Sequence, residues 1–155
     1  MHQYNFTNRT AIVTGGAQGF GLDIAKKFLK FGASKVIIWD IDEDELKKAS
    51  KEVNNSKLFY EVVDISNFES VNDAVNKIIK LSNIDILVNN AGITGSTSEL
   101  WNYDVKEWYK IIAINLNGTF NCCKSVVPNM IKNNYGRIVN VASVAGKDGN
   151  ANASA

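Results

Sequence analysis

Thr14-Gly15-Gly16-Ala17-Gln18-Gly19-Phe20-Gly21 is the stretch that decides the fold. It follows a compact apolar run at residues 10–14 and opens a segment, residues 19–31, whose apolar residues recur at helical spacing. Glycines at such a strand-to-helix turn let the backbone bend tightly and approach a phosphate, while the helix N-terminus offers free N–H groups to that anion. The spacing is G-x-x-x-G-x-G rather than the common G-x-G-x-x-G, so the turn alone is equally compatible with a structural role.

Short apolar runs alternate with helical segments along the whole chain. Further runs rich in Val and Ile lie at residues 35–39, 58–63, 84–88 and 136–142, and further helical patterns at residues 42–53, 66–81 and 104–133. Such runs, bounded by turn-forming residues, indicate buried strands. Their strict alternation with helices predicts an α/β fold, a doubly wound parallel sheet with helices on both faces and right-handed crossovers. We expect a single domain over residues 1–155.

The ends of the predicted helices carry capping signals. Gly32 follows the first helix as a C-terminal cap, and Ser66 opens the sequence Ser-Asn-Phe-Glu, which is a capping box for the third. Asp104 is the predicted N-cap of the long last helix. Gly118 and Pro128 lie inside that helix, where we expect them to bend it.

Composition and charge exclude several classes of function. The 155 residues carry 17 Lys+Arg against 16 Asp+Glu, so no basic field favours nucleic acid or anionic lipid. The lone His2 and the adjacent Cys122-Cys123 cannot supply a zinc cage, a histidine-based triad or a disulfide framework. No apolar run reaches the roughly 18 residues of a membrane span, and the N-terminus lacks a signal-peptide pattern. We expect a cytoplasmic protein with no metal.

Asp40 is the first residue past the second apolar run and stands 19 residues after Gly21. An acid near this spacing accepts hydrogen bonds from the adenosine ribose of a dinucleotide and repels the additional phosphate of NADP. The alternative is a solvated loop acid beside the acidic residues 42–44. Because Ile41 rather than Arg or Lys follows, the pattern favours NAD as the cofactor.

Taken together, these motifs resemble the short-chain dehydrogenase/reductase family from about Arg9 to Ala155. The resemblance implies a Rossmann-like sheet, truncated here after the fifth strand, and an incomplete NAD-binding domain. The family motif T-G-x-x-x-G-x-G matches Thr14–Gly21. The residues of this turn that the resemblance assigns to cofactor binding are Gly15, Gln18, Gly19, Phe20 and Gly21.

Two later elements match the cofactor-binding pattern of the family. Asp64, followed by Ile65, matches the acid that contacts the adenine amino group, although a carboxylate there could instead cap the next helix. The segment Asn89-Asn90-Ala91-Gly92 matches N-N-A-G, where small residues let the cofactor pass and the asparagines tie the central strand in place. The resemblance therefore assigns Asn90, Ala91 and Gly92 to the cofactor. The asparagines could also simply satisfy backbone groups in a turn.

Two residues match the catalytic pattern. Asn115 matches the asparagine that holds a water in the proton relay, and Ser143 matches the serine that hydrogen-bonds the substrate oxygen. The family's catalytic tyrosine follows that serine by thirteen residues, one position beyond Ala155, and a lysine follows four residues later. No Tyr-x-x-x-Lys occurs within the sequence. Without the resemblance, Asn115 would be an ordinary polar helix residue and Ser143 an ordinary strand-end serine.

We therefore expect the N-terminal part of an NAD-dependent oxidoreductase. Its reaction would transfer hydride between the nicotinamide and a secondary alcohol or ketone. The sequence is similar to the 3-oxoacyl-acyl-carrier-protein reductase branch and to the sugar and polyol dehydrogenase branches, and the former usually favour NADP. The alternative is a truncated product that binds a nucleotide or a full-length subunit without catalysis.

The resemblance also implies surfaces that other segments cover. We expect an exposed apolar edge at residues 137–141 and a helix face without a partner, formed by Ile112, Leu116, Phe120 and Val127. The complete form would be a homo-oligomer, a tetramer built on the long helices. Cys122 and Cys123 are predicted packing residues. The aromatic residues near the start of the long helix are predicted core or subunit contacts: Trp101, Tyr103, Trp108 and Tyr109.

Overall fold

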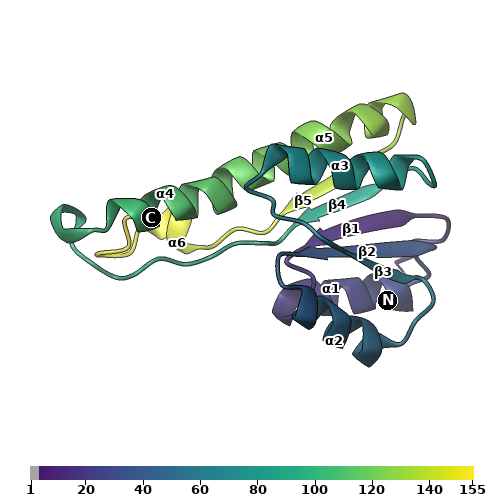
Figure 1. The fold of residues 1–155 in the computed structure, drawn as a ribbon, viewed down its shortest axis with the longest axis horizontal. Coiled ribbons are helices and arrows are strands. Elements are labelled where there is room, and N and C mark those ends of the chain that lie inside the picture. The colour runs from purple at the N-terminus through teal and green to yellow at the C-terminus, as the bar shows by residue number, and fades with distance from the viewer. Residues whose placement is uncertain (1–3) are drawn as a thin grey trace.

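Five parallel strands form one sheet in the order β3-β2-β1-β4-β5 (Figure 1). The computed structural model describes residues 4–155, and His2 lies outside that range. The strands are β1 (Thr10–Thr14), β2 (Lys35–Asp40), β3 (Leu58–Val62), β4 (Ile86–Asn89) and β5 (Arg137–Asn140). The chain runs outward from β1 to β3, then crosses back to β4 on the other side. This is the predicted doubly wound, Rossmann-like arrangement, and the strand order reverses between β1 and β4.

Helices cover both faces of the sheet and create two apolar cores (Figure 1). On one face lie α1 (Gly19–Lys30) and α2 (Glu43–Val53), and on the other α3 (Phe68–Ile79) and α5 (Thr119–Lys132). Because side chains alternate along a strand, Ile38 of β2 enters the first core and Trp39 the second. All residues of β1, the central strand, are buried, as expected of a parallel strand between two helical layers.

The predicted long helix is one helical run with an unpredicted segment in its middle. It comprises α4 (Val105–Ile111), a π-helical segment η2 (Ile112–Gly118) and α5. Asp104 caps α4 as expected, because its Oδ1 accepts a hydrogen bond from the Lys106 amide at 2.9 Å. Pro128 lies inside α5 without ending it. The irregularity that the sequence placed at Gly118 is therefore a π segment, a feature often found at functional sites.

The predicted start of α3 is wrong by one residue. Asn67, not Ser66, is the N-cap, since its Oδ1 accepts from the Ser70 amide at 3.1 Å. The Ser66 hydroxyl instead donates to Asp64 Oδ1 at 2.7 Å, because a carboxylate is a stronger acceptor and lies two residues away. Gly32 does follow α1 in the left-handed region, with φ +92°.

Several element boundaries also differ from the expected ones. β4 begins at Ile86 rather than residue 84, because the Ile84 amide donates to Asn129 Oδ1 of α5. β5 is shorter than residues 136–142. Two short helices were not predicted: η1 (Leu100–Asn102) and α6 (Ala145–Asp148). Among residues 4–155, none of the helices combines the length and apolar character that crossing a bilayer requires.

Most of the apolar surface that was expected to lack a partner, at β5 and on the long helical run, is exposed. Every residue of β5 is exposed, and Leu116 and Phe120 are 62% and 61% exposed. Ile112 and Val127 of the same predicted face are only half-buried. The exposed apolar edge at β5 is thus confirmed, whereas the helix face is narrower than predicted.

The cysteines and aromatic residues divide between core and surface. Cys122 is buried, which raises the pKa of its thiol to about 12, and Cys123 packs half-buried against the same core. Both are therefore packing residues, as predicted. Trp101, Trp108 and Tyr109 are exposed, so the expectation of a core position is wrong for them because η1 and α4 project beyond the sheet (Figure 1).

Candidate nucleotide-binding and active site

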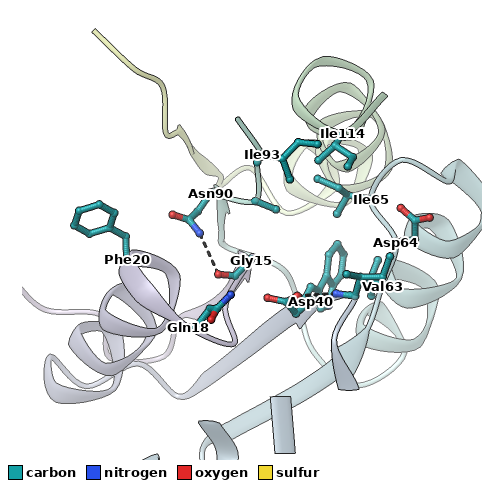
Figure 2. Close-up of a pocket in the computed structure, with 14 residues that line it drawn as sticks. Gly15, Gln18, Phe20, Asp40, Val63, Asp64, Ile65, Asn90, Ile93 and Ile114 are labelled. Carbon is teal, nitrogen blue, oxygen red and sulfur yellow. Dashed lines mark hydrogen bonds between the residues drawn. The ribbon is translucent and has the colours of Figure 1, made fainter. Parts of the chain in front are cut away.

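A cleft of about 400 Å³ opens beyond the carboxyl ends of β1, β2 and β4 (Figure 2). It lies at the point where the strand order reverses, which is where open parallel sheets bind their ligands. Its lining comprises Gly15, Gln18, Phe20, Trp39, Asp40, Ile41, Val63, Asp64, Ile65, Asn90, Ala91, Gly92, Ile93 and Ile114. Every predicted cofactor-binding residue except Gly19 and Gly21 is in this set.

The glycine turn is tightly packed between Gly15 and Gly21 and open at Gly19. Gly15 and Gly19 have φ of +60° and +53°, in the left-handed region that favours glycine. A Cβ on Gly21 would lie 2.0 Å from the Gly15 carbonyl oxygen, so Gly21 lets α1 pack onto the turn. A Cβ on Gly19 would meet no atom within 4 Å. The backbone there is accessible to a bulky group such as a phosphate.

The N-terminus of α1 is electrostatically uncompensated. Gln18 is the N-cap, but its side chain makes no capping hydrogen bond, and the first turn contains no acidic residue. The first amides of α1 and the positive end of its dipole are therefore available to an anion. The Phe20 side chain points away from Asp40 and is 81% exposed, so the turn offers backbone rather than an aromatic contact at this position (Figure 2).

The Asp40 carboxylate is held against the glycine turn. Its Oδ2 accepts from the Ala17 amide at 3.3 Å, and its Oδ1 accepts from the Ile41 and Asp42 amides at 2.8 and 3.3 Å. These backbone donors fix the carboxylate on the cleft, whereas the acids that follow it begin α2. The bond from the Ala17 amide joins Asp40 to the glycine turn, whereas the bonds from Ile41 and Asp42 are local to its own loop.

Asn90 ties the end of β4 to the glycine turn, as predicted. Its Nδ2 donates to the carbonyl oxygens of Thr14 and Gly15 at 3.0 and 3.1 Å (Figure 2). Asn89 is buried, and its Nδ2 donates to Asn140 Oδ1 at 2.8 Å and to Cys123 Sγ at 3.3 Å. Asn90 thus joins the end of β4 to β1, and Asn89 joins it to β5. These hydrogen bonds satisfy polar groups and also position the edge of the cleft.

Asn115 holds the other side of the cleft through its side chain. Its Oδ1 accepts from the Ile93 amide, and its Nδ2 donates to the Ile93 carbonyl, both at 2.9 Å. The Asn115 carbonyl oxygen accepts from the Thr119 hydroxyl at 2.8 Å, which uses one of its two lone pairs. The Asn115 side chain thus uses one donor and one acceptor site on the Ile93 backbone and ties the helical run to the segment that follows β4.

Ser143 lies beyond β5 and outside the cleft lining. Its Oγ accepts from the Ala145 amide at 3.1 Å at the start of α6, which leaves its own proton free to be donated. Asp64, by contrast, lines the cleft, and its Oδ1 accepts from the Ser66 amide at 2.9 Å. Since Asn67 caps α3, the alternative of Asp64 as that helix's cap is wrong.

Comparison with known proteins decides the family. A family model described as short chain dehydrogenase matches residues 9–155. The chain belongs to the short-chain dehydrogenase family. It is 43% identical over 151 residues to 2-dehydro-3-deoxy-L-rhamnonate dehydrogenase (NAD(+)) of Sphingomonas sp. (strain SKA58), covering 97% of this chain and 59% of that protein. It is 40% identical over 146 residues to the 3-oxoacyl-[acyl-carrier-protein] reductase FabG of Chlamydia muridarum, covering 92% and 58%.

Solved structures of dehydrogenases and oxidoreductases have the same fold. The chain superposes on an NAD+-bound xylitol dehydrogenase with a TM-score of 0.92 and 31% identity, over 97% of this chain and 59% of the other. A metagenomic short-chain oxidoreductase in complex with NADP gives 0.89 and 28%, over 96% and 68%. The chain spans less than two thirds of the length of the curated relatives it matches.

Several residues of this short-chain dehydrogenase cleft were missed by sequence reasoning. Trp39, Ile93 and Ile114 line it, and each is adjacent in sequence to a predicted element or residue. The Thr14 hydroxyl accepts from the amides of Asn90 and Ala91, both at 3.0 Å. Thr14 belongs to the quoted motif, so the sequence could have indicated it as a site residue. Its hydrogen-bond partners lie 76 and 77 residues away, and no sequence pattern indicates them.

The loop that follows the N-N-A-G element is fastened to α4. The amide and hydroxyl of Ser96 donate to the two carboxylate oxygens of Glu107, and these hydrogen bonds lower the pKa of that carboxyl below its ordinary value. Gly95 makes the approach possible, because a Cβ there would lie 2.0 Å from the Tyr103 hydroxyl oxygen. In the described part of the chain no group of three or more His, Cys, Asp and Glu side chains is arranged to hold a metal ion.

Proposed function

We propose that this chain forms the cofactor-binding part of an NAD(H)-dependent oxidoreductase. One observation carries the proposal. The Asp40 carboxylate lines the cleft, the Ala17 amide ties it to the glycine turn, and the backbone of that turn is open at Gly19. Anion-accepting backbone beside a fixed carboxylate suits the pyrophosphate and the ribose diol of a dinucleotide.

The residues of the cleft fit the parts of such a cofactor. The open amides at the start of α1 would receive the pyrophosphate, and the Asp40 carboxylate would accept hydrogen bonds from the ribose hydroxyls. Asp64 and Ile65 form one wall of the cleft, and Ala91 belongs to the opposite side, so the adenine would lie between them. When bound, the nicotinamide supplies hydride transfer. An additional phosphate on that ribose would meet the Asp40 carboxylate, which supports NAD over NADP.

A secondary alcohol or ketone is the proposed substrate class. Ser143 supports this, because the Ala145 amide fixes its oxygen and leaves its proton to be donated to a substrate oxygen. The names of the relatives refer to a deoxy sugar acid, to a 3-oxoacyl group on an acyl carrier protein and to the polyol xylitol. Because NAD preference accords with the NAD(+)-linked sugar-acid relative, we favour a sugar or polyol alcohol over a 3-oxoacyl substrate.

The proposed assembly of the whole protein is a homo-oligomer, a tetramer. Leu116 and Phe120 support it, since both are large, apolar and exposed on neighbouring turns of the long helical run. They lie on the helical segment that the family resemblance associates with subunit contacts. Neither residue lines the cleft.

A fluorescence titration tests the cofactor. NADH and NADPH are titrated into the 155-residue chain, and we expect NADH to bind at least about tenfold more tightly, since one like-charge contact of about 1.4 kcal/mol suffices for that ratio. Equal affinities would overturn the assignment of NAD. Binding without any alcohol-dependent reduction of NAD by the whole protein would instead support the alternative of a nucleotide-binding protein without catalysis.

A further inference from the structure

The helical run η2–α5 forms hydrogen bonds to two segments that line the cleft. Asn115 and Asn121, six residues apart, each hydrogen-bond the backbone of a different wall. Asn115 holds Ile93, which follows β4, and the Asn121 Nδ2 donates to the Ile65 carbonyl at 2.9 Å, after β3. Figure 2 shows the side chains of Ile65, Ile93 and Ile114 gathered at this end of the cleft. The helix thus determines how far apart the two walls stand.

Asn121 is an unusual residue for its position. It is 7% exposed, and its neighbour Cys122 and Val126 both lie in the apolar core. A buried amide is costly unless its hydrogen bonds are made. The Asn121 amide nitrogen uses its donors on the carbonyl oxygens of Ile65, at 2.9 Å, and Ser66, at 3.4 Å. Both carbonyls belong to the turn that carries Asp64 between β3 and α3.

Gly118 contacts the same turn by close packing rather than by a hydrogen bond. It is buried, and a Cβ there would lie 2.7 Å from Ile65 Cδ1 and 2.8 Å from Ile65 Cγ1. The glycine therefore provides the space in which the Ile65 side chain packs on the helix, three residues before the asparagine that bonds the Ile65 carbonyl. Side chain and backbone of Ile65 are both fixed from this one stretch of helix.

We propose that Asn121 is a positioning residue for the adenine end of the cleft, which rests on the proposed cofactor function. It acts through the segment from Asp64 to Ser66 and touches no reacting atom. By fixing the two carbonyls, it fixes where Asp64 and Ile65 stand relative to Ile93, which follows β4. Loss of this bond lets the wall move outward and weakens the fit to a flat aromatic base.

Asn129 provides a matched control on the same helix. Its Oδ1 accepts from the Ile84 amide at 3.0 Å, so it too fixes the backbone of a loop next to the sheet. Ile84 precedes β4 and is outside the cleft lining, at the opposite end of the strands. Asn121→Leu removes the bonds to the Ile65 and Ser66 carbonyls, and Asn129→Leu removes the bond from the Ile84 amide. We expect both variants to melt at a lower temperature than the wild type.

Two measurements on Asn121→Leu, Asn129→Leu and the unchanged chain test the proposal. The first is NADH affinity, and we expect Asn121→Leu to bind about tenfold more weakly while Asn129→Leu binds as the wild type does. The second is amide hydrogen exchange over residues 63–67, which a purely global loss of stability would not single out. We expect it to be faster in Asn121→Leu alone. If Asn121→Leu does not fold, Asn121→Ser, which is polar but too short to reach Ile65, takes its place.

The outcomes separate this inference from the proposed function. If the wild-type chain fails to bind NADH, the cofactor assignment fails, and the exchange of residues 63–67 alone decides whether Asn121 holds the wall. Unchanged exchange in Asn121→Leu overturns the positioning role, as does unchanged NADH affinity in a wild type that binds. Equal weakening of NADH binding in Asn129→Leu also overturns it, because the effect would then come from lost stability.

Discussion

Asn90 donates two hydrogen bonds to Thr14 across the junction of β1 and β4. The Thr14 Oγ1 accepts from the Asn90 amide at 3.0 Å, and the Asn90 Nδ2 donates to the Thr14 carbonyl at 3.0 Å. The Thr14 hydroxyl itself donates to the Val88 carbonyl at 3.4 Å. One buried hydroxyl therefore joins the glycine turn to the strand across the reversal of strand order.

Thr14→Val removes this hydroxyl at nearly constant volume. The amides of Asn90 and Ala91 then lose their acceptor, and at about 1–3 kcal/mol for an unsatisfied buried group we expect a loss of about 2–4 kcal/mol in the free energy of unfolding. NADH affinity should fall as well, since Asn90 and Ala91 line the cleft. Urea unfolding and NADH titration measure both. Thr10→Val, at the opposite end of the same strand, is the control, and a loss of the same size there would contradict the assigned role.

Gly19→Ala and Gly21→Ala are expected to separate binding from folding. A methyl group on Gly21 would lie 2.0 Å from the Gly15 carbonyl oxygen, so Gly21→Ala should destabilise the fold by about 2–3 kcal/mol through overpacking. A methyl group on Gly19 meets no atom, and its φ of +53° costs about 1 kcal/mol. It would, however, occupy the side of the turn proposed for the pyrophosphate.

We therefore expect Gly19→Ala to lose NADH binding while its thermal melt stays within a few degrees of the wild type. Gly21→Ala should lose both. Calorimetric melts and NADH titrations of the two variants give the comparison. Tight NADH binding by Gly19→Ala would show that the pyrophosphate lies elsewhere.

Asp40→Ala tests the discrimination between NAD and NADP. The carboxylate is the charged group that the structure fixes beside the glycine turn, and removing it eliminates both the ribose acceptor and the repulsion of a ribose phosphate. We expect NADH affinity to fall and NADPH affinity to rise, so that their ratio shifts by about tenfold or more. Asp44→Ala, whose position in the first turn of α2 is outside the cleft lining, should leave the ratio unchanged. An unchanged ratio in Asp40→Ala would show that another residue discriminates.

The attachment of the loop after Gly92 to α4 should depend on pH. Hydrogen bonds from Ser96 lower the pKa of Glu107 in the folded protein, so the ionised form stabilises the closed loop. That contribution is complete above the ordinary carboxyl pKa of 4.5 and is lost as the pH falls through the lowered value. The protection of residues 93–98 against hydrogen exchange, measured relative to the intrinsic rate at each pH, should therefore fall at acidic pH. In Ser96→Ala the exchange should be fast at neutral pH as well, and a pH response that persists in this variant would point to another group.

The sequence predicts the frame of the site but not the contacts across it. The strands are predictable from sequence because short apolar runs between turn-forming residues form few other structures. Gly15 and Asp40 are predictable because binding a phosphate and a ribose restricts which residues can occupy those positions. The start of α3 is less readable, because Ser66 and Asn67 are adjacent and both can cap. Asp64 decides between them by accepting from the Ser66 hydroxyl.

The contacts of the long helical run are the part that sequence reasoning could not reach. Asn115 and Ile93 are 22 residues apart, and Asn121 and Ile65 are 56 apart, so no local pattern relates them. The π segment between Ile111 and α5 is wound differently from an α-helix, so no local sequence pattern indicated it. Ile112, the first residue of this segment, was expected to be exposed and is half-buried, whereas Leu116 within it is exposed as predicted.

The exposed apolar surfaces lead to the last prediction, that the 155-residue chain associates in solution. Leu116 and Phe120 stand exposed on the long helical run, and Ile138 and Val139 of β5 are exposed on a sheet edge with unpaired backbone groups. Light scattering should give a mass above one chain. If the helix makes the contact between chains, the double variant Leu116→Lys, Phe120→Lys should lower this mass. If the sheet edge makes it, Val139→Lys should do so. Ile41→Lys, an exposed apolar residue near α2, is the control. A monodisperse monomer with a cooperative melt in the unchanged chain would mean that neither surface is adhesive.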